Sequence, residues 1–168
     1  SSIGVSIVRD SRQLEDAFAL AFQYGDTALV ERYIRGRELT VPVLGDDPLP
    51  VVELRLGREF YDYRAKYEDN QTQILCPAEL APEITARAQA TALATHLALG
   101  CRDVSRTDMI LDAQGLCWVL ETNTLPGLTS HSLLPRAALA VGLSFTELCE
   151  FLLCRALERS RAEASRTP

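Results

Sequence analysis

The 168-residue chain contains no apolar run that approaches the roughly 20 residues that a membrane-spanning helix needs. It also lacks an excess of basic residues, because 17 Lys and Arg stand against 23 Asp and Glu, which gives a net charge of −6. Without a basic surface to bind phosphates, nucleic acid is not expected as the main partner. The sequence shows no internal repeat and no low-complexity segment, so we expect a globular protein that contacts neither membrane nor nucleic acid.

A disulfide framework is absent as well. The five cysteines are odd in number and form no C-x-x-C pair, so we expect them to be reduced, mostly core residues of a cytoplasmic protein. The more specific alternative is a zinc site. The spacing of the cysteines is unsuitable for one, and only His96 and His131 could serve as further ligands. The cysteines are Cys76, Cys101, Cys117, Cys149 and Cys154.

The start of the chain has no charged region followed by an apolar stretch, so no signal peptide is predicted. An initiator Met is also missing, and we therefore expect the chain to begin inside a longer one. The length suffices for one domain or two small lobes with a buried core.

Capping signals predict three helices, over residues 10–24, 82–100 and 144–157. The first and third begin with an Asp or Ser that is followed three residues later by Gln or Glu, the pattern of a capping box. The second begins with Pro82 and stops at Gly100, which suits the first and the terminating position of a helix.

Strand-like runs fill the remaining chain. They cover residues 28–34, 38–44, 51–55, 104–111 and 116–123. The first two are joined by Arg35-Gly36-Arg37, and the last two flank residues 112–115, which are typical of a hairpin turn. This order of elements predicts an α+β fold in which helices pack on a mainly antiparallel sheet.

Polar residues recur at alternate positions of the last two strands. Because alternate side chains of a strand share a face, Arg106 lies with Asp108, and Glu121 with Asn123. A connecting loop with an even number of residues would put all four on one face. Carboxylate and amide oxygens suit Mg²⁺, whereas Arg106 would meet negative charge developing nearby. A solvated polar face with a surface ion pair is the alternative.

The loop after this hairpin is rich in hydrogen-bond donors. Gly127 lets the backbone approach a ligand, and the hydroxyl and imidazole groups that follow could hold an anion or form an oxyanion hole. The alternative is a turn in which Ser132 caps a helix from Leu133 to Val141, and both can hold together. We interpret His131 as a positioning or structural residue rather than as a base.

The segment RTDMILDAQGLCWVLETNTLPGLTSHSLLP resembles the C-terminal lobe of D-alanine–D-alanine ligases, which belong to the ATP-grasp superfamily. Three further segments resemble this family in the same order: SSIGVSIV its phosphate-covering loop, ERYIRGRELTV its adenine- and ribose-binding hinge, and YDYRAKY its mobile loop with a phosphate-binding lysine. The resemblance extends from Ser1 to about Leu157.

The resemblance implies a role for each matching residue. Catalytic roles fall on Arg106 and the Gly127 N–H at the tetrahedral intermediate, and on Ser1, Glu38 and Tyr67, which latch the two loops closed. ATP binding falls on Ser2 and Lys66 at the phosphates, on Glu31, Arg32 and Ile34 at adenine, and on Glu38 at the ribose. The second D-alanine would contact Ser132 and Leu133, and two Mg²⁺ ions, replaceable by Mn²⁺, would contact Asp108, Asn123 and a bridging Glu121.

The resemblance also implies a domain arrangement. Residues 1–158 would form the C-terminal catalytic portion of an ATP-grasp enzyme, with part of the central ATP-binding lobe near residues 1–35. Residues 159–168 would be a frayed tail, and the N-terminal lobe would lie outside this chain. Arg32 departs from the family, because lysine is usual there and arginine keeps the charge but changes the shape.

The implied function is ATP- and Mg²⁺-dependent ligation of two D-alanines through an acylphosphate, for peptidoglycan precursor synthesis in the cytoplasm. The partners would be ATP and D-alanine, and a homodimer is allowed. Ligation of D-alanine to D-lactate or D-serine is the near alternative, although Tyr67 and Leu133 favour the dipeptide. Alternatives of other classes are an inactive nucleotide-binding fragment and a divalent-metal or structural module without turnover.

Overall fold

A computed structural model describes residues 3–55 and 73–164 of the chain. Contacts divide the chain into two units, Ser1–Ile34 with Leu56–Gln73 and Arg35–Arg55 with Ile74–Pro168. The second unit carries the sheet and most of the residues of interest.

The first unit contains the 3₁₀ turn η1 (Ser11–Gln13) and helix α1 (Leu14–Ala21). The predicted capping box is present, since Asp10 Oδ1 accepts from the Arg12 N–H at 2.9 Å and Gln13 Oε1 accepts from the Asp10 N–H at 3.3 Å. The strand predicted over residues 28–34 is wrong: this segment has no regular secondary structure. Its Leu29 and Val30 are 83% and 69% exposed, and no strand among the described residues pairs with it.

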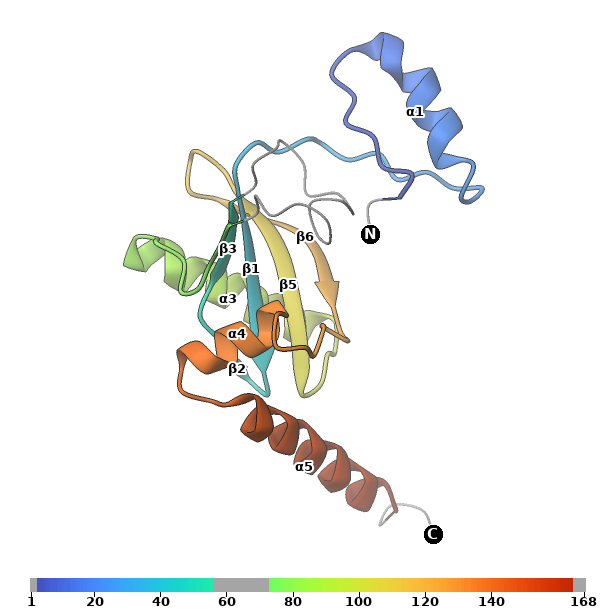
Figure 1. Ribbon diagram of the computed structural model, residues 1–168. Helices are drawn as coiled ribbons and strands as arrows, with labels where there is room; N and C mark the ends of the chain where they lie inside the picture. Colours follow the sequence, from blue (N-terminus) through green and yellow to red (C-terminus); the bar gives the residue numbers. More distant parts are fainter. Residues whose placement is uncertain (1–2, 56–72, 165–168) are drawn as a thin grey trace. The chain divides into compact units, whose positions relative to one another are not determined.

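The second unit is built on a six-stranded sheet with the order β4-β3-β1-β5-β6, and β2 pairs with β1 (Figure 1). The strands are β1 (Arg37–Leu44), β2 (Asp47–Pro48), β3 (Val52–Arg55), β4 (Gln73–Leu75), β5 (Val104–Leu111) and β6 (Cys117–Asn123). β1 is antiparallel to β2, β3 and β5, and β5 is antiparallel to β6. The predicted antiparallel sheet is therefore confirmed, and only the very short β2 and β4 were not predicted.

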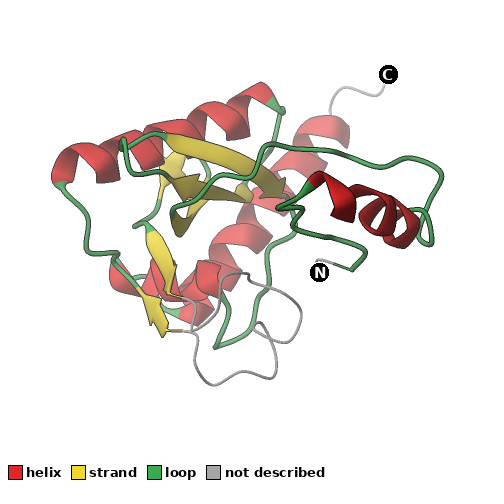
Figure 2. Ribbon diagram, turned by 90° about the horizontal axis from the view of Figure 1, so that it is seen from above, coloured by secondary structure: helices red, strands yellow, loops and turns green. Residues whose placement is uncertain are grey.

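Helices cover both faces of the sheet: α3 (Pro82–Ala98) on one side, and α4 (Leu133–Ala140) with α5 (Phe145–Ala164) on the other (Figure 1). Figure 2 shows the strands from above as a layer with helices on either side. Pro82 opens α3 as predicted. The α5 capping box is also confirmed, since Glu147 Oε2 accepts from the Ser144 N–H at 2.8 Å. α5 continues beyond the predicted end near Leu157 to Ala164, because no glycine or proline lies between these two residues to stop it.

Each face of the sheet has its own hydrophobic core. The α3 side buries odd-numbered residues of β1 and β5, such as Leu39 and Met109, against Ala88 and Ala92. The other side packs residues including Leu44, Val52 and Val104 against α4 and α5. Leu44 and Val104 pair at one end of β1 and β5, and Glu38 lies near the opposite end of β1. The second core is therefore anchored at the end of the sheet away from Glu38.

The five cysteines carry no disulfide, but the prediction that most are core residues is wrong. Cys76, Cys101 and Cys117 are half-buried, whereas Cys149 and Cys154 are exposed. The last two lie on α5, whose buried positions are taken by Leu148 and its neighbours in the second core.

No single described helix is long and apolar enough to cross a membrane. Among the helices that the structure describes, α4 and α5 taken together, bent by 105°, are the one pair that meets the length and composition of a span, a test that buried core helices also pass.

Candidate functional site

The four polar residues predicted on the hairpin do lie on one face of the sheet. In the β5–β6 ladder Arg106 pairs with Asn123, and Asp108 pairs with Glu121. Directly opposed residues of antiparallel strands share a face and hold their Cβ atoms about 4.5–5.5 Å apart. In the β1–β5 ladder Thr40 pairs with Asp108, so β1 contributes to the same face.

The predicted reason for this arrangement is wrong, although the arrangement itself is right. Close to the turn Leu111 pairs with Cys117, so the loop of residues 112–116 has an odd and not an even number of residues. The register then shifts between Asp108 and Met109, and this irregularity leaves Leu120 as an extra residue on β6. Without the shift, Glu121 and Asn123 would lie on the α3 side of the sheet, because a one-residue slip exchanges the two faces.

Asp108 is held by side chains from two strands. Arg106 binds it in a bidentate manner, with Nε donating to Oδ1 at 2.9 Å and Nη2 donating to Oδ2 at 2.7 Å. Thr40 Oγ1, from β1, donates a second hydrogen bond to Oδ1. The side chains of Arg106 and Asp108 are only 10% and 24% exposed, so water screens this ion pair less than a surface pair.

Glu121 and Asn123 stand at the open edge of the site. Glu121 is exposed, because β6 is the last strand of the sheet. Within the part of the chain that the structure describes, its carboxylate has no hydrogen bond or ion pair. Asn123 Oδ1 accepts from the Leu125 N–H at 2.9 Å, which begins the turn into the following loop.

Glu38 adds a third acidic group. It lies on β1 next but one to Thr40, on the same face as Asp108. Burial, together with the negative charge of Asp108, raises the pKa of Glu38 to about 7. Negative charges placed this close together favour the binding of a cation.

The loop brings the predicted oxyanion donor and the predicted carboxylate-binding residue together. A Cβ atom on Gly127 would lie 2.8 Å from Ser132 Oγ, so the two residues are in close contact. Ser132 precedes α4, but its hydroxyl makes no cap and instead accepts from the Thr129 N–H at 3.2 Å. The predicted helix cap is therefore wrong in its hydrogen bond. His131 is exposed, and its carbonyl accepts from Arg136 Nε at 3.2 Å.

The donor set fits Mg²⁺. Asp108 and Glu121 supply carboxylate oxygens and Asn123 supplies an amide oxygen, and a carboxylate that accepts from Arg106 and Thr40 retains lone pairs for a cation. In the described ranges, no group of three or more His, Cys, Asp or Glu side chains is placed so that it could hold a metal ion by itself. A cation held here would therefore take its remaining ligands from water and from substrate oxygens.

Three of the remaining predicted contacts lie in the first unit, and four lie outside the described residues. Glu31, Arg32 and Ile34 belong to the first unit, where Glu31 and Arg32 are exposed and Ile34 is half-buried. The remaining predictions, on Ser1, Ser2, Lys66 and Tyr67, lie outside the described residues.

A family model described as D-ala D-ala ligase C-terminus matches residues 1–154. The chain belongs to this family. A curated D-alanine–D-alanine ligase from Vesicomyosocius okutanii is 47% identical over 148 residues, covering 88% of this chain and 50% of that protein. One from Bordetella avium is 42% identical over 168 residues, covering 98% of this chain and 53% of that protein. The chain thus spans about half the length of the curated relatives that it matches.

Solved structures of the D-alanine–D-alanine ligase family confirm the predicted fold class. The enzyme from Bacillus anthracis matches with a TM-score of 0.84 at 36% identity, covering 97% of this chain and 53% of that one. Its complex with ATP matches with a TM-score of 0.82 at 35% identity, covering 96% of this chain and 53% of that one. VanG D-Ala:D-Ser ligase from Enterococcus faecalis matches with a TM-score of 0.81 at 36% identity, covering 91% and 46%.

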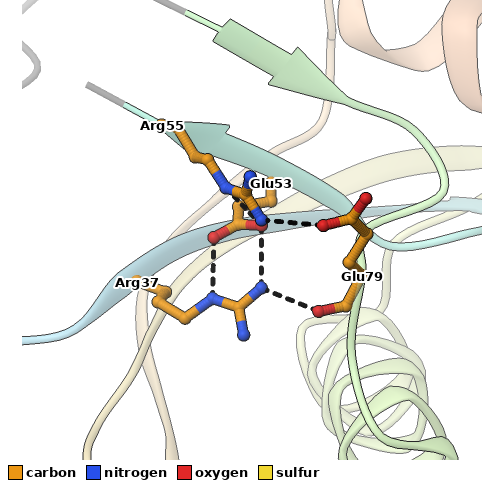
Figure 3. Close-up of polar contacts among 4 residues, drawn as sticks. All are labelled: Arg37, Glu53, Arg55 and Glu79. Atoms are coloured by element: carbon orange, nitrogen blue, oxygen red, sulfur yellow. Dashed lines mark hydrogen bonds and ion pairs between the residues drawn. The ribbon is translucent and has the colours of Figure 1, made fainter. Parts of the chain in front are cut away.

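One polar cluster of this D-alanine–D-alanine ligase family member was not predicted (Figure 3). Glu53, only 3% exposed, accepts from Arg37 Nε at 2.7 Å and Nη2 at 2.8 Å, and pairs with Arg55 at 3.3 Å. Arg37 Nη2 also donates to the Glu79 carbonyl at 3.0 Å. The hydrogen bonds from Arg37 lower the pKa of Glu53 despite its burial. A lone Glu in the apolar run 51–55 was the available signal. The cluster ties β1 and β3 to the segment before α3.

Proposed function

We propose that this chain is the catalytic C-terminal portion of an ATP-dependent ligase that joins two D-alanines. The observation that carries the proposal is the register that puts Arg106, Asp108, Glu121 and Asn123 on one face of the sheet. Family membership supports it, as does the structural match to a D-alanine–D-alanine ligase complexed with ATP. Residues 1–158 would be this portion, with part of a central ATP-binding lobe near residues 1–35.

The metal-binding role is assigned to Asp108, Glu121 and Asn123. When bound there, Mg²⁺ neutralises the negative charge of the ATP phosphates, and Mn²⁺ can replace it. The exposed Glu121 is the residue we propose to contact two ions, since its carboxylate is not engaged by another described side chain. Asp108 has less freedom, because Arg106 and Thr40 fix its orientation.

The first chemical step forms an acylphosphate, when the carboxylate of one D-alanine attacks the γ-phosphorus of ATP and ADP leaves. The chain contributes positioning and charge, which is what phosphoryl transfer chiefly requires. We assign the phosphates to Ser2 and Lys66, the adenine to Glu31, Arg32 and Ile34, and the ribose to Glu38.

In the second step the amine of the other D-alanine attacks the acylphosphate carbonyl. A C–N bond forms, the C–O bond to phosphate breaks, inorganic phosphate leaves, and the amine nitrogen loses a proton. Arg106 and the Gly127 N–H would stabilise the oxyanion that develops, and Ser132 with the Leu133 N–H would hold the carboxylate of the attacking amino acid. The contact between Gly127 and Ser132 supports these two roles, because it puts the proposed oxyanion donor next to the proposed carboxylate-binding residue. Ser1, Glu38 and Tyr67 would hold the loops closed so that water does not hydrolyse the acylphosphate.

The biological setting is proposed with the activity: synthesis of a peptidoglycan precursor in the cytoplasm, with ATP and D-alanine as partners and a homodimer as the allowed assembly.

The test is ADP release by the complete protein, measured with a coupled assay in the presence and absence of D-alanine. We expect release that depends on both D-alanine and Mg²⁺. ADP release at the same rate with and without D-alanine, or no ADP release at all, would contradict the proposal.

A second candidate is ligation of D-alanine to D-serine, because VanG D-Ala:D-Ser ligase matches at the same 36% identity as the Bacillus anthracis enzyme. Competition among D-alanine, D-serine and D-lactate as the second substrate, followed by product analysis, separates these ligases. We expect D-alanyl-D-alanine to dominate.

A further inference from the structure

Thr40 is a buried residue with a polar group in the middle of β1. Its side chain is only 1% exposed, and it pairs with Asp108 across the β1–β5 ladder. On the same face of β1 the next positions towards its end are Pro42 and Leu44, which are buried and apolar. Valine has the same shape as threonine and a similar preference for strands. Packing and strand preference therefore do not explain why a hydroxyl group is buried at position 40.

The reason lies in its hydrogen bond to Asp108. Thr40 Oγ1 donates to Asp108 Oδ1, the same oxygen that accepts from Arg106 Nε at 2.9 Å. Arg106 binds the carboxylate from the same strand, β5, whereas Thr40 binds it from the neighbouring strand β1. Two donors from different strands restrict the rotation of the carboxylate more than either donor alone.

We propose that Thr40 is a positioning residue that holds Asp108 in the orientation in which it binds the divalent cation. This inference rests on the proposed metal-binding role of Asp108. Residues that hydrogen-bond to metal ligands commonly orient them, and their loss costs about 10- to 100-fold in metal affinity or activity. Thr40 also maintains this orientation if Arg106 turns towards negative charge on the substrate.

The test compares Thr40→Val with Thr107→Val in the complete protein. Thr107 is a matched control: it is fully buried on β5 next to Asp108, but it faces the other side of the sheet, where its Oγ1 lies 3.0 Å from Thr122 Oγ1. Both changes remove one buried threonine hydroxyl and keep a branched side chain. Thr40→Ser, which retains the hydroxyl, is the rescue variant.

The first readout is Mn²⁺ binding to the protein saturated with ADP, measured by the electron paramagnetic resonance signal of free Mn²⁺. The second is the Mg²⁺ concentration that gives half-maximal ADP release at saturating ATP. We expect Thr40→Val to weaken Mn²⁺ binding and to raise the Mg²⁺ requirement by about tenfold or more. Thr107→Val and Thr40→Ser should stay near the unsubstituted protein in both readouts.

Equal cation affinity in Thr40→Val and Thr107→Val would overturn the inference, as would failure of Thr40→Ser to restore binding. Asp108→Asn separates this outcome from failure of the proposed function: if Asp108→Asn leaves Mn²⁺ binding unchanged, the metal site itself is misplaced. If Thr40→Val does not fold, Thr40→Ala removes the hydroxyl without adding atoms and is held to the same expectation.

Discussion

At the scale of single residues, Asp108 is where most contacts of the site converge. It accepts from Arg106 and Thr40, pairs with Glu121 across the ladder, and helps to raise the pKa of Glu38. Glu121 differs, because it is exposed and no described side chain engages its carboxylate. The proposed metal site therefore combines one fixed carboxylate with one that remains adaptable.

This difference makes Glu121→Gln an informative substitution. The amide has nearly the same shape but no charge, and a metal ion at such a site contributes several kcal/mol to the transition state. We expect Mg²⁺-dependent ADP release by the complete protein to fall at least about 100-fold, measured at saturating D-alanine. The melting temperature should hardly change, because the Glu121 side chain is exposed.

Glu150→Gln is the matched control for Glu121. It lies exposed on α5 and is expected to leave ADP release unchanged. Near-normal turnover in Glu121→Gln would remove Glu121 from the metal site.

At the scale of elements, the extra residue in β6 decides which face the site occupies. Leu111 pairs with Cys117 on the turn side, and Asp108 pairs with Glu121 beyond the register shift. The odd number of residues in the turn and the extra Leu120 compensate each other. Bulges of this kind are common next to active sites, where they redirect side chains.

Two single-residue deletions test this account. Deleting Leu120 removes the extra residue and leaves Asp108 opposite Glu121, so we expect Mn²⁺ binding to persist. Deleting Thr122 turns Asn123, a proposed ligand, to the α3 side. Mn²⁺ binding should weaken at least about tenfold, since even the loss of a residue that only supports a ligand costs about that much. The measurement is Mn²⁺ affinity, with circular dichroism to show that both variants fold. Equal affinity in the two deletions would contradict the register argument.

The elements show what local sequence signals can and cannot predict. The capping boxes at Asp10 and Ser144, and the proline that opens α3, act within one turn, so the helix starts were predictable. The strand predicted over residues 28–34 does not form. A strand needs a neighbouring strand to pair with, and the sequence of the segment itself does not specify that partner.

The residues of the site were likewise predictable where their placement depends on one strand, and not where it depends on pairing between strands. Alternation along one strand correctly placed Arg106 with Asp108, since it is a property of the strand itself. Thr40 was missed because it meets Asp108 only through the pairing of β1 with β5, 68 positions apart in the chain. Long-range pairing also decided the exposure of Glu121, which depends on β6 being the edge strand.

At the scale of the whole molecule, two carboxylates give stability opposite dependences on pH. The pKa of Glu53 is lowered by Arg37, so its contribution is present above its ordinary pKa and is lost as the pH falls. The pKa of Glu38 is raised from 4.5 to about 7, mainly by burial. Between these values the folded state binds more protons than the unfolded state at Glu38, so stability decreases as the pH rises.

Replacing Glu38 with Gln should remove this decrease. We expect the unfolding free energy of Glu38→Gln, relative to the unsubstituted protein, to rise between about pH 4.5 and about pH 7, since only the unsubstituted protein ionises the half-buried carboxyl of residue 38 there. Urea titrations across this range, in EDTA and without nucleotide, provide the measurement. Glu150→Gln, exposed on α5, is the control and should run parallel to the unsubstituted protein. Parallel curves for Glu38→Gln would contradict the raised pKa.

The compensation between the turn and Leu120 also bears on how this hairpin can change during evolution. A gain or loss of one residue in the turn alone would move either Glu121 and Asn123 or the apolar residues of β6 to the wrong face. Length changes in the hairpin should therefore survive only in pairs, or where one of them adds or removes the extra residue in β6. Related sequences of different hairpin length offer a natural record of this constraint, with the spacing from Glu121 to Asn123 kept constant throughout.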